Sequence, residues 1–436
     1  MTADPRATLA SSPMSGIQIA VVAITIGLNA LDGFDVLAIS FASPGIARDW
    51  GIDRAALGFI LSMELLGMGL GSVLLGGVAD KIGRRRTLLG CLIVMAIGMG
   101  LASRATGVYD LSAWRVFTGI GIGGMLAATN AVVAEFSNSK RRDLNVSLMV
   151  IGYPVGAVVG GSIAALLLKE GDWRVVFKFG AAATTTFIPL VLWLVPESVS
   201  WLCRRQPADA LARVNRSLTR MKFAQIAALP TIPPAELERS AVDIFSPQLA
   251  RLTLLVTIAY FFHITTFYFI LKWVPKIVVD MGFTASSAAG VLVWANIGGA
   301  VGGAVFGLLT QRFGLKRLTM IVLAVSTLME VVFGSGRTTI AGLALVCVVT
   351  GFFTNAGVVG LYSLMAQVFP THVRATGTGF AIGFGRAGAW LSPIIAGYLF
   401  HTGHGLEFVA IAMGTGSLLA VVALWLLPFE PEAAGV

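Results

Sequence analysis

The chain has 436 residues, of which 56% are hydrophobic and only 12% are charged. Soluble globular domains carry about 25% charged residues, so this composition excludes an ordinary soluble domain and indicates a protein that lies in a membrane. The formal net charge of +9 would by itself also fit a nucleic-acid-binding protein, and the positions of the basic residues decide between the two.

Twelve mostly apolar stretches follow one another along the chain, each close to the ~20 residues that a helix needs to cross the hydrocarbon core. In chain order, the predicted spans are residues 17–38, 55–78, 87–104, 110–134, 144–168, 174–195, 250–275, 285–311, 317–334, 338–366, 374–400 and 405–428. Residues 1–15 lack the basic start and the Ala-x-Ala site of a cleaved signal peptide. We therefore expect the first span to remain in the mature protein.

Basic residues gather in the connections that follow even-numbered spans. Examples are residues 84–86 after the second span, 140–142 after the fourth and 316–317 after the eighth, whereas the odd-numbered connections carry far fewer. Because short loops rich in Lys and Arg stay on the cytoplasmic side, we predict a multi-pass protein of the bacterial inner membrane with both termini in the cytoplasm. The positive charge then follows from topology, and no nucleic-acid partner is expected.

One long polar stretch, rich in proline and charge, divides six spans from six. We predict an N-terminal bundle at residues 1–195, a cytoplasmic linker at 196–248 and a C-terminal bundle at 249–436. An internal repeat supports this division: the pattern that begins at Gly76 returns at Gly307, an offset of 231 positions (307 minus 76), and Ala134 with its neighbours returns at Ala366, an offset of 232 (366 minus 134). Parallel repeats predict two bundles with a substrate site between them near mid-membrane.

Several of these segments resemble known motifs. Residues 76–86, GGVADKIGRRR, resemble the loop signature of the major facilitator superfamily, and residues 307–317 are its weaker copy. The arginine and glycines of Arg115-x-x-x-Gly119-x-Gly121 are similar to the fourth-helix motif of that superfamily. The resemblance implies an all-α integral membrane fold, with twelve transmembrane helices in two pseudo-symmetric six-helix bundles.

Within the superfamily, the motifs of this sequence resemble those of one family in particular. Residues 31–35, LDGFD, together with residues 134–142 and 196–198, are similar to the aromatic acid:proton symporter family. This resemblance implies a secondary active transporter that imports an aromatic carboxylate, of the benzoate or hydroxybenzoate type, by proton symport with alternating access. It also implicates the two aspartates of the first span in transport.

Four ionisable residues are predicted to couple protons. Asp32 and Asp35 lie one helical turn apart and share a face, and two buried carboxyl groups close together can bind and release a proton near physiological pH. Glu64 is a second intramembrane acid in the middle of its span, where a lone charge is costly. Arg115 lies near the start of the fourth span, where we expect it to reach the interface or to pair with an acid of the first helix. The alternative for each acid is a purely structural contact with a neighbouring helix or, for the aspartates, a place at the periplasmic helix end.

A second group is predicted to bind the substrate. Arg386 lies deep in its span and its planar guanidinium suits a carboxylate, although an ion pair between helices is the alternative. Lys272 either faces the cavity, where it could hold a second carboxylate or a phenolate, or snorkels outward. Polar and aromatic side chains that we expect to line the site, with packing against core or lipid as their alternative, are Tyr153, Asn296, Asn355, Tyr362 and Trp390.

A third group is predicted to control gating at the cytoplasmic side. We expect Asp80 to accept hydrogen bonds from helix amides or to pair with Arg142, while Arg84 and its neighbours stay in water. Glu135 and Arg374 belong to the repeated pattern after the fourth and tenth spans. These contacts would hold one conformational state closed.

Other function classes are not favoured. No G-x-x-x-x-G-K-[ST] segment is present, no metal-ligand cluster is visible, and no nucleophile, base and oxyanion set occurs together, so we expect neither an enzyme nor any cofactor or metal. The expected partners are the aromatic substrate, protons and membrane lipid, with the chain acting as a monomer. The alternatives are a symporter for another organic acid or a polyol, a drug:proton antiporter, and a transporter-like sensor.

Overall fold

The structure is a computed structural model, and it describes residues 4–230, 244–247, 249–310, 312–336, 339–369 and 373–428. Within these residues the chain forms fifteen helices and no strand. The twelve long helices are α2 (Gly16–Trp50), α3 (Arg54–Ile82), α4 (Arg84–Ala102), α5 (Val108–Phe136), α6 (Arg142–Leu167), α7 (Arg174–Leu194), α10 (Ala250–Asp280), α11 (Ala285–Leu309), α12 (Leu315–Gly334), α13 (Ile340–Val368), α14 (Arg374–His401) and α15 (Leu406–Trp425). The short helices are α1 (Pro5–Ser11), α8 (Val199–Arg205) and α9 (Ala210–Arg220).

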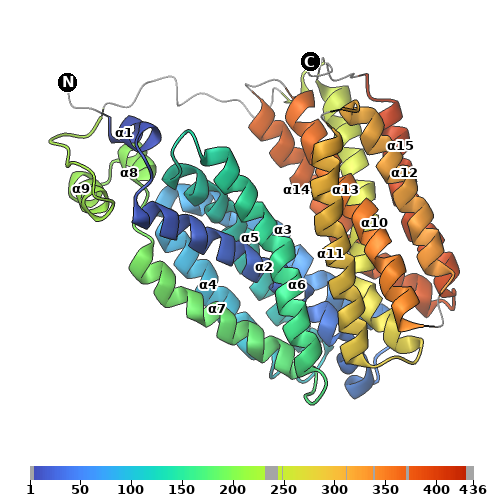
Figure 1. Cartoon of the computed structure of the whole chain (residues 1–436). Coiled ribbons are helices and arrows are strands. Elements are labelled where there is room, and N and C mark those ends of the chain that lie inside the picture. Colours follow the sequence, from blue (N-terminus) through green and yellow to red (C-terminus); the bar gives the residue numbers. More distant parts are fainter. Residues whose placement is uncertain are drawn as a thin grey trace.

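The long helices form two bundles, α2–α7 and α10–α15, as Figure 1 shows. The main helix pairings recur in both: α3 with α5 matches α11 with α13, α2 with α6 matches α10 with α14, and α4 with α7 matches α12 with α15. Over the described residues, eleven helices are long and apolar enough to cross a membrane; α14 is the other long helix, and it contains Arg386 and many glycines. The predicted fold class, two pseudo-symmetric six-helix bundles, is confirmed.

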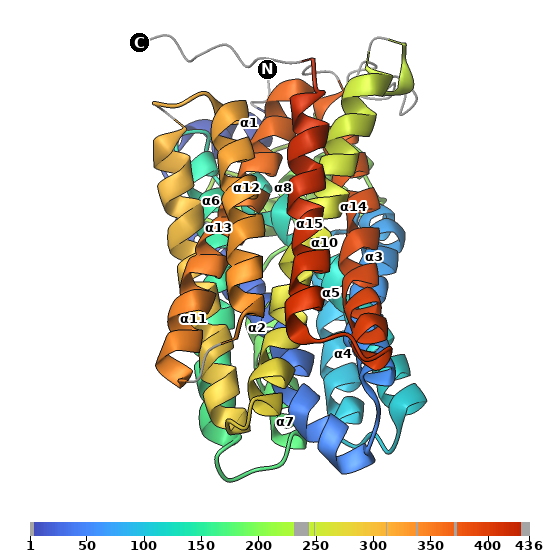
Figure 2. The ribbon, with the colours of Figure 1, turned by 90° about the vertical axis from the view of Figure 1, so that its right-hand side faces the viewer.

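The described ends of the chain lie at the same face of the molecule, together with α1, α8 and α9 (Figures 1 and 2). We call this the terminal face and the opposite one the distal face. In the chain, α7 ends at Leu194 and α10 begins at Ala250, and we retain residues 196–248 as the proposed linker between the bundles.

Several predicted spans are shorter than the helices that contain them, and the first and the seventh end well before their helices do. The first was predicted to end at residue 38, but α2 continues to Trp50 and passes through Pro44. The seventh was predicted to end at residue 275, but α10 continues to Asp280. Hydropathy measures only the length that crosses the apolar core, whereas neighbouring helices can support a helix beyond it and through a proline.

Glycines allow the first bundle to pack closely around the two aspartates of α2. A methyl group on Gly33 would lie 2.0 Å from the backbone oxygen of Tyr153 in α6, and one on Gly156 would lie 1.7 Å from that of Ala30. No side chain fits there, so α2 and α6 touch backbone to backbone. Gly152 and Gly160, each four residues from Gly156, likewise leave no room for a side chain against Ile26 and Phe34 of α2.

The two bundles are joined at the distal face, and their ribbons diverge towards the terminal face (Figure 1). Arg54 of α3 donates to Asp280 of α10 at 3.0 Å, and Nδ1 of His401 lies 3.2 Å from a carboxylate oxygen of Asp53. Ser286 of α11 donates to the backbone oxygen of residue 165 in α6 at 2.7 Å. The structure is therefore of a state that is closed at the distal face.

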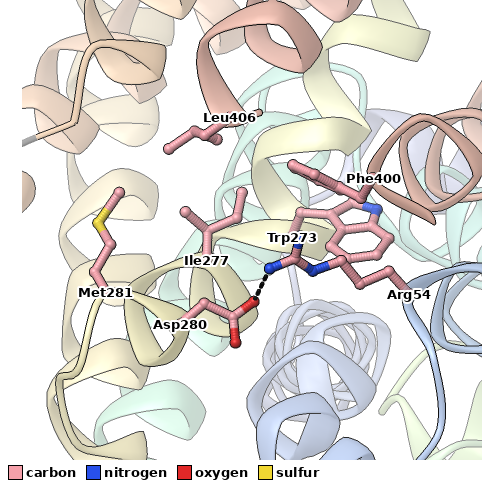
Figure 3. A pocket seen from close by; sticks show the side chains of 7 residues that line it. All are labelled: Arg54, Trp273, Ile277, Asp280, Met281, Phe400 and Leu406. Carbon is pink, nitrogen blue, oxygen red and sulfur yellow. Dashed lines mark hydrogen bonds and ion pairs between the residues drawn. The ribbon is translucent and has the colours of Figure 1, made fainter. Parts of the chain in front are cut away.

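A small cavity of about 150 Å³ lies beside this closure, and it is lined by Arg54, Trp273, Ile277, Asp280, Met281, Phe400 and Leu406. Figure 3 shows the Arg54 guanidinium reaching across to Asp280 in the cavity wall. The same guanidinium lies 5.2 Å from the centre of the Phe400 ring. None of these lining residues belongs to the charged cluster described next, and Arg54 and Asp280 make the cavity part of the distal closure.

Candidate functional site

Five ionisable side chains gather in the interior, where α10 meets the first bundle. They are Asp32, Asp35, Glu64, Arg115 and Lys272, and each has no exposed surface. Charges inside a membrane protein are costly unless they are paired or reached by water. Their concentration at one level is the strongest sign of a functional site in the described residues.

Glu64 of α3 lies between two cations. One carboxylate oxygen forms an ion pair with Arg115 of α5, and the other lies 3.5 Å from Nζ of Lys272 in α10. Lys272 also donates to the backbone oxygen of Val36 in α2. Because Lys272 belongs to the second bundle and Glu64 to the first, this ion pair crosses the interface between the bundles.

The surroundings of Arg115 differ from both sequence-based alternatives. The side chain is fully buried rather than at the interface, and its acid partner is Glu64 of the second span rather than an aspartate of the first. Its other contacts are the backbone oxygen of Asp35, at 3.0 Å, and Sδ of Met99, at 2.9 Å. The reason is packing, because α3 and α5 lie against each other through glycines such as Gly67 and Gly119.

The two aspartates of α2 are buried without a hydrogen-bond partner for either carboxylate oxygen, as far as the described residues go. Thr184 of α7 lies beside Asp35, but its hydroxyl donates to the backbone oxygen of Gly180. Asp32 interacts electrostatically with Asp35, Glu64 and Arg386. The Asp32 carboxyl is therefore free to bind a proton, and it lies within electrostatic range of a cation of the other bundle.

Arg386 of α14 is half-buried and forms no ion pair with any described residue. It interacts electrostatically with three tyrosines, namely Tyr153, Tyr260 and Tyr268. The hydroxyl of Tyr260 in turn lies 3.0 Å from that of Tyr362. An unpaired guanidinium beside several phenol groups can bind a carboxylate and hold an aromatic ring next to it.

Tyr260 was missed by the sequence reasoning. It stands in an aromatic run towards the middle of the predicted seventh span, next to Phe261 and Phe262. Its ring packs against Gly385, the residue before Arg386, since a methyl group at that glycine would lie 2.0 Å from the ring. The signal in the sequence that could have identified Tyr260 was a polar aromatic residue near the middle of a predicted span.

The remaining predicted substrate residues have other contacts in this state. Asn296 donates to the backbone oxygen of Leu292 in its own helix at 2.8 Å, and Asn355 of α13 donates to that of Gly299 in α11 at 2.7 Å. Nε1 of Trp390 is buried and has no hydrogen-bond partner among the described residues. Of the three, Trp390 alone offers a free donor.

At the terminal face, three of the five residues predicted to control gating form one network. Arg84 pairs with Asp80 at 2.7 Å and with Glu135 at 3.0 Å, and its backbone N–H donates to Glu197 at 2.8 Å. The prediction that Arg84 stays in water is wrong, because only 6% of its surface is exposed. Arg84 also takes the place of Arg142 as the partner of Asp80.

The other two gating residues begin equivalent helices. Arg142 starts α6 and is exposed. Arg374 starts α14, and its side chain lies outside the described residues. Glu197 is a further member of the network: its carboxylate accepts from the backbone N–H groups of Arg84 and Arg85 at the start of α4, and no gating role was predicted for it.

Comparisons with known proteins agree with this architecture. The family model described as Major Facilitator Superfamily matches residues 25–299 and 256–436. The chain is 28% identical to the gallate transporter of Pseudomonas putida, over 97% of this chain and 94% of the relative. It is 31% identical to the 3-(3-hydroxy-phenyl)propionate transporter of Escherichia coli, over 93% of each.

Among solved structures, the inward open conformation of the xylose transporter XylE from E. coli is similar, with a TM-score of 0.73. It is 17% identical, and the match covers 96% of this chain and 98% of that one. At this identity the likeness concerns the fold alone.

Proposed function

Because the chain belongs to the Major Facilitator Superfamily, and is thus a multi-pass membrane transporter rather than an enzyme, we propose that it imports a small aromatic carboxylate together with protons by alternating access. The named relatives transport gallate and 3-(3-hydroxy-phenyl)propionate, and both compounds combine an aromatic ring with a carboxylate. We further propose that the terminal face is the cytoplasmic face of the bacterial inner membrane. The positive-inside pattern of the loops supports this orientation.

The observation that carries the proposal is the charge balance of the buried site. Three carboxyl groups (Asp32, Asp35 and Glu64) share it with three cations (Arg115, Lys272 and Arg386). An anionic substrate on Arg386 adds one negative charge to a region where excess charge is costly. Asp32 interacts electrostatically with Arg386 and accepts no hydrogen bond from a described residue, and its protonation restores the balance. Binding of the anion and binding of the proton then stabilise each other.

The same groups account for recognition of an aromatic acid. Arg386 can bind a carboxylate through two parallel hydrogen bonds, and it has no competing ion pair among the described residues. The tyrosines beside it offer ring faces for stacking and hydroxyl groups for polar substituents, and Nε1 of Trp390 is a donor without a partner. A polyol carries no negative charge and would therefore form no ion pair with Arg386.

Alternating access requires that the interface contacts break and reform. In the distal-closed state, the ion pair of Glu64 with Lys272 and that of Arg54 with Asp280 both join the bundles. Opening of the distal face has to break both of these pairs. We propose that the network of Arg84, Asp80 and Glu135 keeps the terminal ends of α3, α4 and α5 together during this motion.

The test is uptake by the purified protein in proteoliposomes, with a panel of labelled benzoates and hydroxybenzoates, an imposed pH gradient and a protonophore control. We expect accumulation that the protonophore abolishes. Asp32→Asn should lose gradient-driven accumulation but keep counterflow, because the variant still binds the anion without cycling a proton. Glu170→Gln, an exposed loop substitution, is the matched control and should behave as wild type.

Two results would contradict the proposal. Transport of a polyol or a drug, with no uptake of any aromatic carboxylate, would exclude the substrate class. Normal accumulation by Asp32→Asn would remove that residue from proton coupling.

A further inference from the structure

The cavity at the distal closure has the size and the walls of a binding site for one aromatic ring. Its volume is about 150 Å³, and an apolar cavity of about 150 Å³ can bind benzene. Five of its seven lining residues are apolar or aromatic, namely Trp273, Ile277, Met281, Phe400 and Leu406. The transport cycle proposed above places no ligand there.

The aromatic part of the wall is held in place by the surrounding helices. The rings of Trp273 and Phe400 pack against each other with their centroids 5.1 Å apart, and both side chains are buried. Nε1 of Trp273 donates to the backbone oxygen of Pro393 in α14 at 3.3 Å. Because these rings are already ordered, a ligand ring can pack against them at little cost in conformational entropy.

A close contact between α3 and α14 brings a cation to this wall. A methyl group on Gly397 would lie 2.5 Å from the backbone oxygen of Arg54, and one on Gly58 would lie 2.4 Å from that of Pro393. The start of α3 therefore lies directly against α14. The Arg54 side chain is 43% exposed, and its guanidinium lies 5.2 Å from the centre of the Phe400 ring. A ligand can thus reach the cation and the aromatic wall together.

The charges at the cavity are not balanced. Asp280 accepts from Arg54 at 3.0 Å, as Figure 3 shows, and it also pairs with Lys276 of its own helix. Two cations therefore share one carboxylate. Among the described residues, Arg54 uses only Nη2 for a hydrogen bond, whereas a guanidinium has five N–H donors. One further carboxylate would complete the balance and would find free donors.

The other acids of these segments do not take that place. Asp53 lies 3.2 Å from Nδ1 of His401, and its other carboxylate oxygen accepts from the backbone N–H of Ala56 at 2.7 Å. Glu407 is exposed. Neither acid lines the cavity, so the missing negative charge is left for a ligand to supply.

We propose that this cavity is a second binding site for an aromatic carboxylate, with the ring against Trp273 and Phe400 and the carboxylate on Arg54. A guanidinium can donate two parallel hydrogen bonds to a carboxylate, and Asp280 keeps its ion pair with Lys276 when Arg54 binds the ligand. The ligand needs both a ring for the apolar wall and a negative charge for the cation. Acetate lacks the first of these features, and benzyl alcohol lacks the second.

An occupied cavity holds the distal face closed. Arg54 belongs to the first bundle, whereas the other lining residues belong to the second. A ligand that contacts both sides binds best while the bundles are together, so it stabilises that state. This consequence rests on the proposed function, because it concerns a cycle of alternating access, whereas the binding itself does not. An acid that enters through the central site therefore inhibits its own uptake at high external concentration.

The binding test is equilibrium dialysis of the full chain, purified in detergent, with labelled benzoate. The wild type should bind two benzoates per chain. Arg386→Gln, which lacks the proposed cation of the central site, should still bind one, and acetate or benzyl alcohol at the same concentration should leave most of it bound. In that background, Arg54→Gln should raise the half-saturation concentration by at least ~10-fold, the change expected when an ion pair to the ligand is lost.

Asp280→Asn is the matched counterpart of Arg54→Gln. Both substitutions remove the same ion pair between the bundles, but Asp280→Asn leaves Arg54 and Lys276 without a carboxylate, so benzoate should bind more tightly. An effect of the ion pair alone would have the same sign in both variants. Arg104→Gln removes an exposed cation elsewhere on the distal face and should leave binding unchanged.

Two results of the dialysis would overturn the inference. One is that a folded Arg386→Gln protein binds no benzoate, and the other is that Arg54→Gln leaves binding unchanged. Either result would leave the proposed function intact, provided that the wild type still binds one benzoate through Arg386. Loss of that central binding alone would contradict the proposed function and not the distal site.

A further variant tests the effect on transport. Leu406→Phe narrows the cavity with a larger side chain but leaves Arg54 and Asp280 unchanged. In intact cells, the initial rate of uptake of the preferred aromatic acid by the wild type should pass through a maximum as the external concentration rises. The rate of Leu406→Phe should instead reach a plateau. A plateau in both proteins would show that occupation of the cavity does not hold the distal face closed.

Discussion

The ion pair between Lys272 and Glu64 offers the most direct test of how the bundles are held together. We expect Lys272→Met to shift the protein away from the distal-closed state. The substitution keeps a flexible side chain of similar length but removes the ammonium that crosses the interface and its hydrogen bond to Val36. Glu64 keeps its ion pair with Arg115, so no carboxylate is left without a cation and the fold should persist.

The size of the shift follows from the geometry. Two unit charges at the observed 3.5 Å attract each other by about 5 kcal/mol at an effective dielectric constant of 20. The cost of removing the Lys272 ammonium from water offsets much of this attraction. We expect a net loss of about 1–3 kcal/mol from the distal-closed state, which is about a 5- to 150-fold change in the ratio of the two states.

The assay is a distance distribution between spin labels on distal connections of the two bundles, at Glu170 and Thr402, both exposed. Native cysteines should react slowly: Cys91 and Cys347 are buried in helices, and burial raises the pKa of the Cys203 thiol to about 11, so the reactive thiolate is scarce at neutral pH. A population at longer distance should appear in Lys272→Met.

The matched control is Lys276→Met, one turn further along α10. Lys276 pairs with Asp280 of its own helix and does not bridge the bundles, so its loss should leave the distances unchanged. If a folded Lys272→Met protein gave the wild-type distribution, the ion pair would not hold the distal face closed and this part of the reasoning would be refuted.

Two further substitutions test the substrate site and the terminal-face network. Arg386→Lys keeps the charge but loses the planar pair of donors, so the half-saturation concentration for the preferred aromatic acid should rise about tenfold or more; an unchanged value in concentration-dependent uptake would exclude bidentate binding there. Arg84→Gln leaves Glu135 and Asp80 without their shared cation and should destabilise the protein by about 3 kcal/mol, seen as a lower Tm in detergent. The exposed Arg86→Gln should not change the Tm, and equal melting of the two variants would show that the network contributes little.

The sequence by itself was sufficient for the architecture. The number of spans, the division into two related halves and the family resemblance all follow from local properties, namely runs of apolar residues, repeated motifs and the distribution of basic residues. The lengths of α2 and α10 were underestimated because a hydropathy window reports the thickness of the apolar core and not the reach of the helix.

The sequence also identified most members of the buried cluster, because an ionisable residue inside an apolar span is exceptional wherever it occurs. A similar signal was present at Tyr260, but it was not taken up. Position along one helix gave no indication of which of these groups face one another.

Only the tertiary structure decided the partners. Glu64 pairs with Arg115 and Lys272, Asp32 interacts electrostatically with Arg386, and Arg84 lies between Asp80 and Glu135. These pairs join residues from different helices and in two cases from different bundles. The energy of a charge in a membrane protein is set by what lies within a few ångströms of it, and that neighbourhood is created by the crossing of helices at glycine contacts, which no single span encodes.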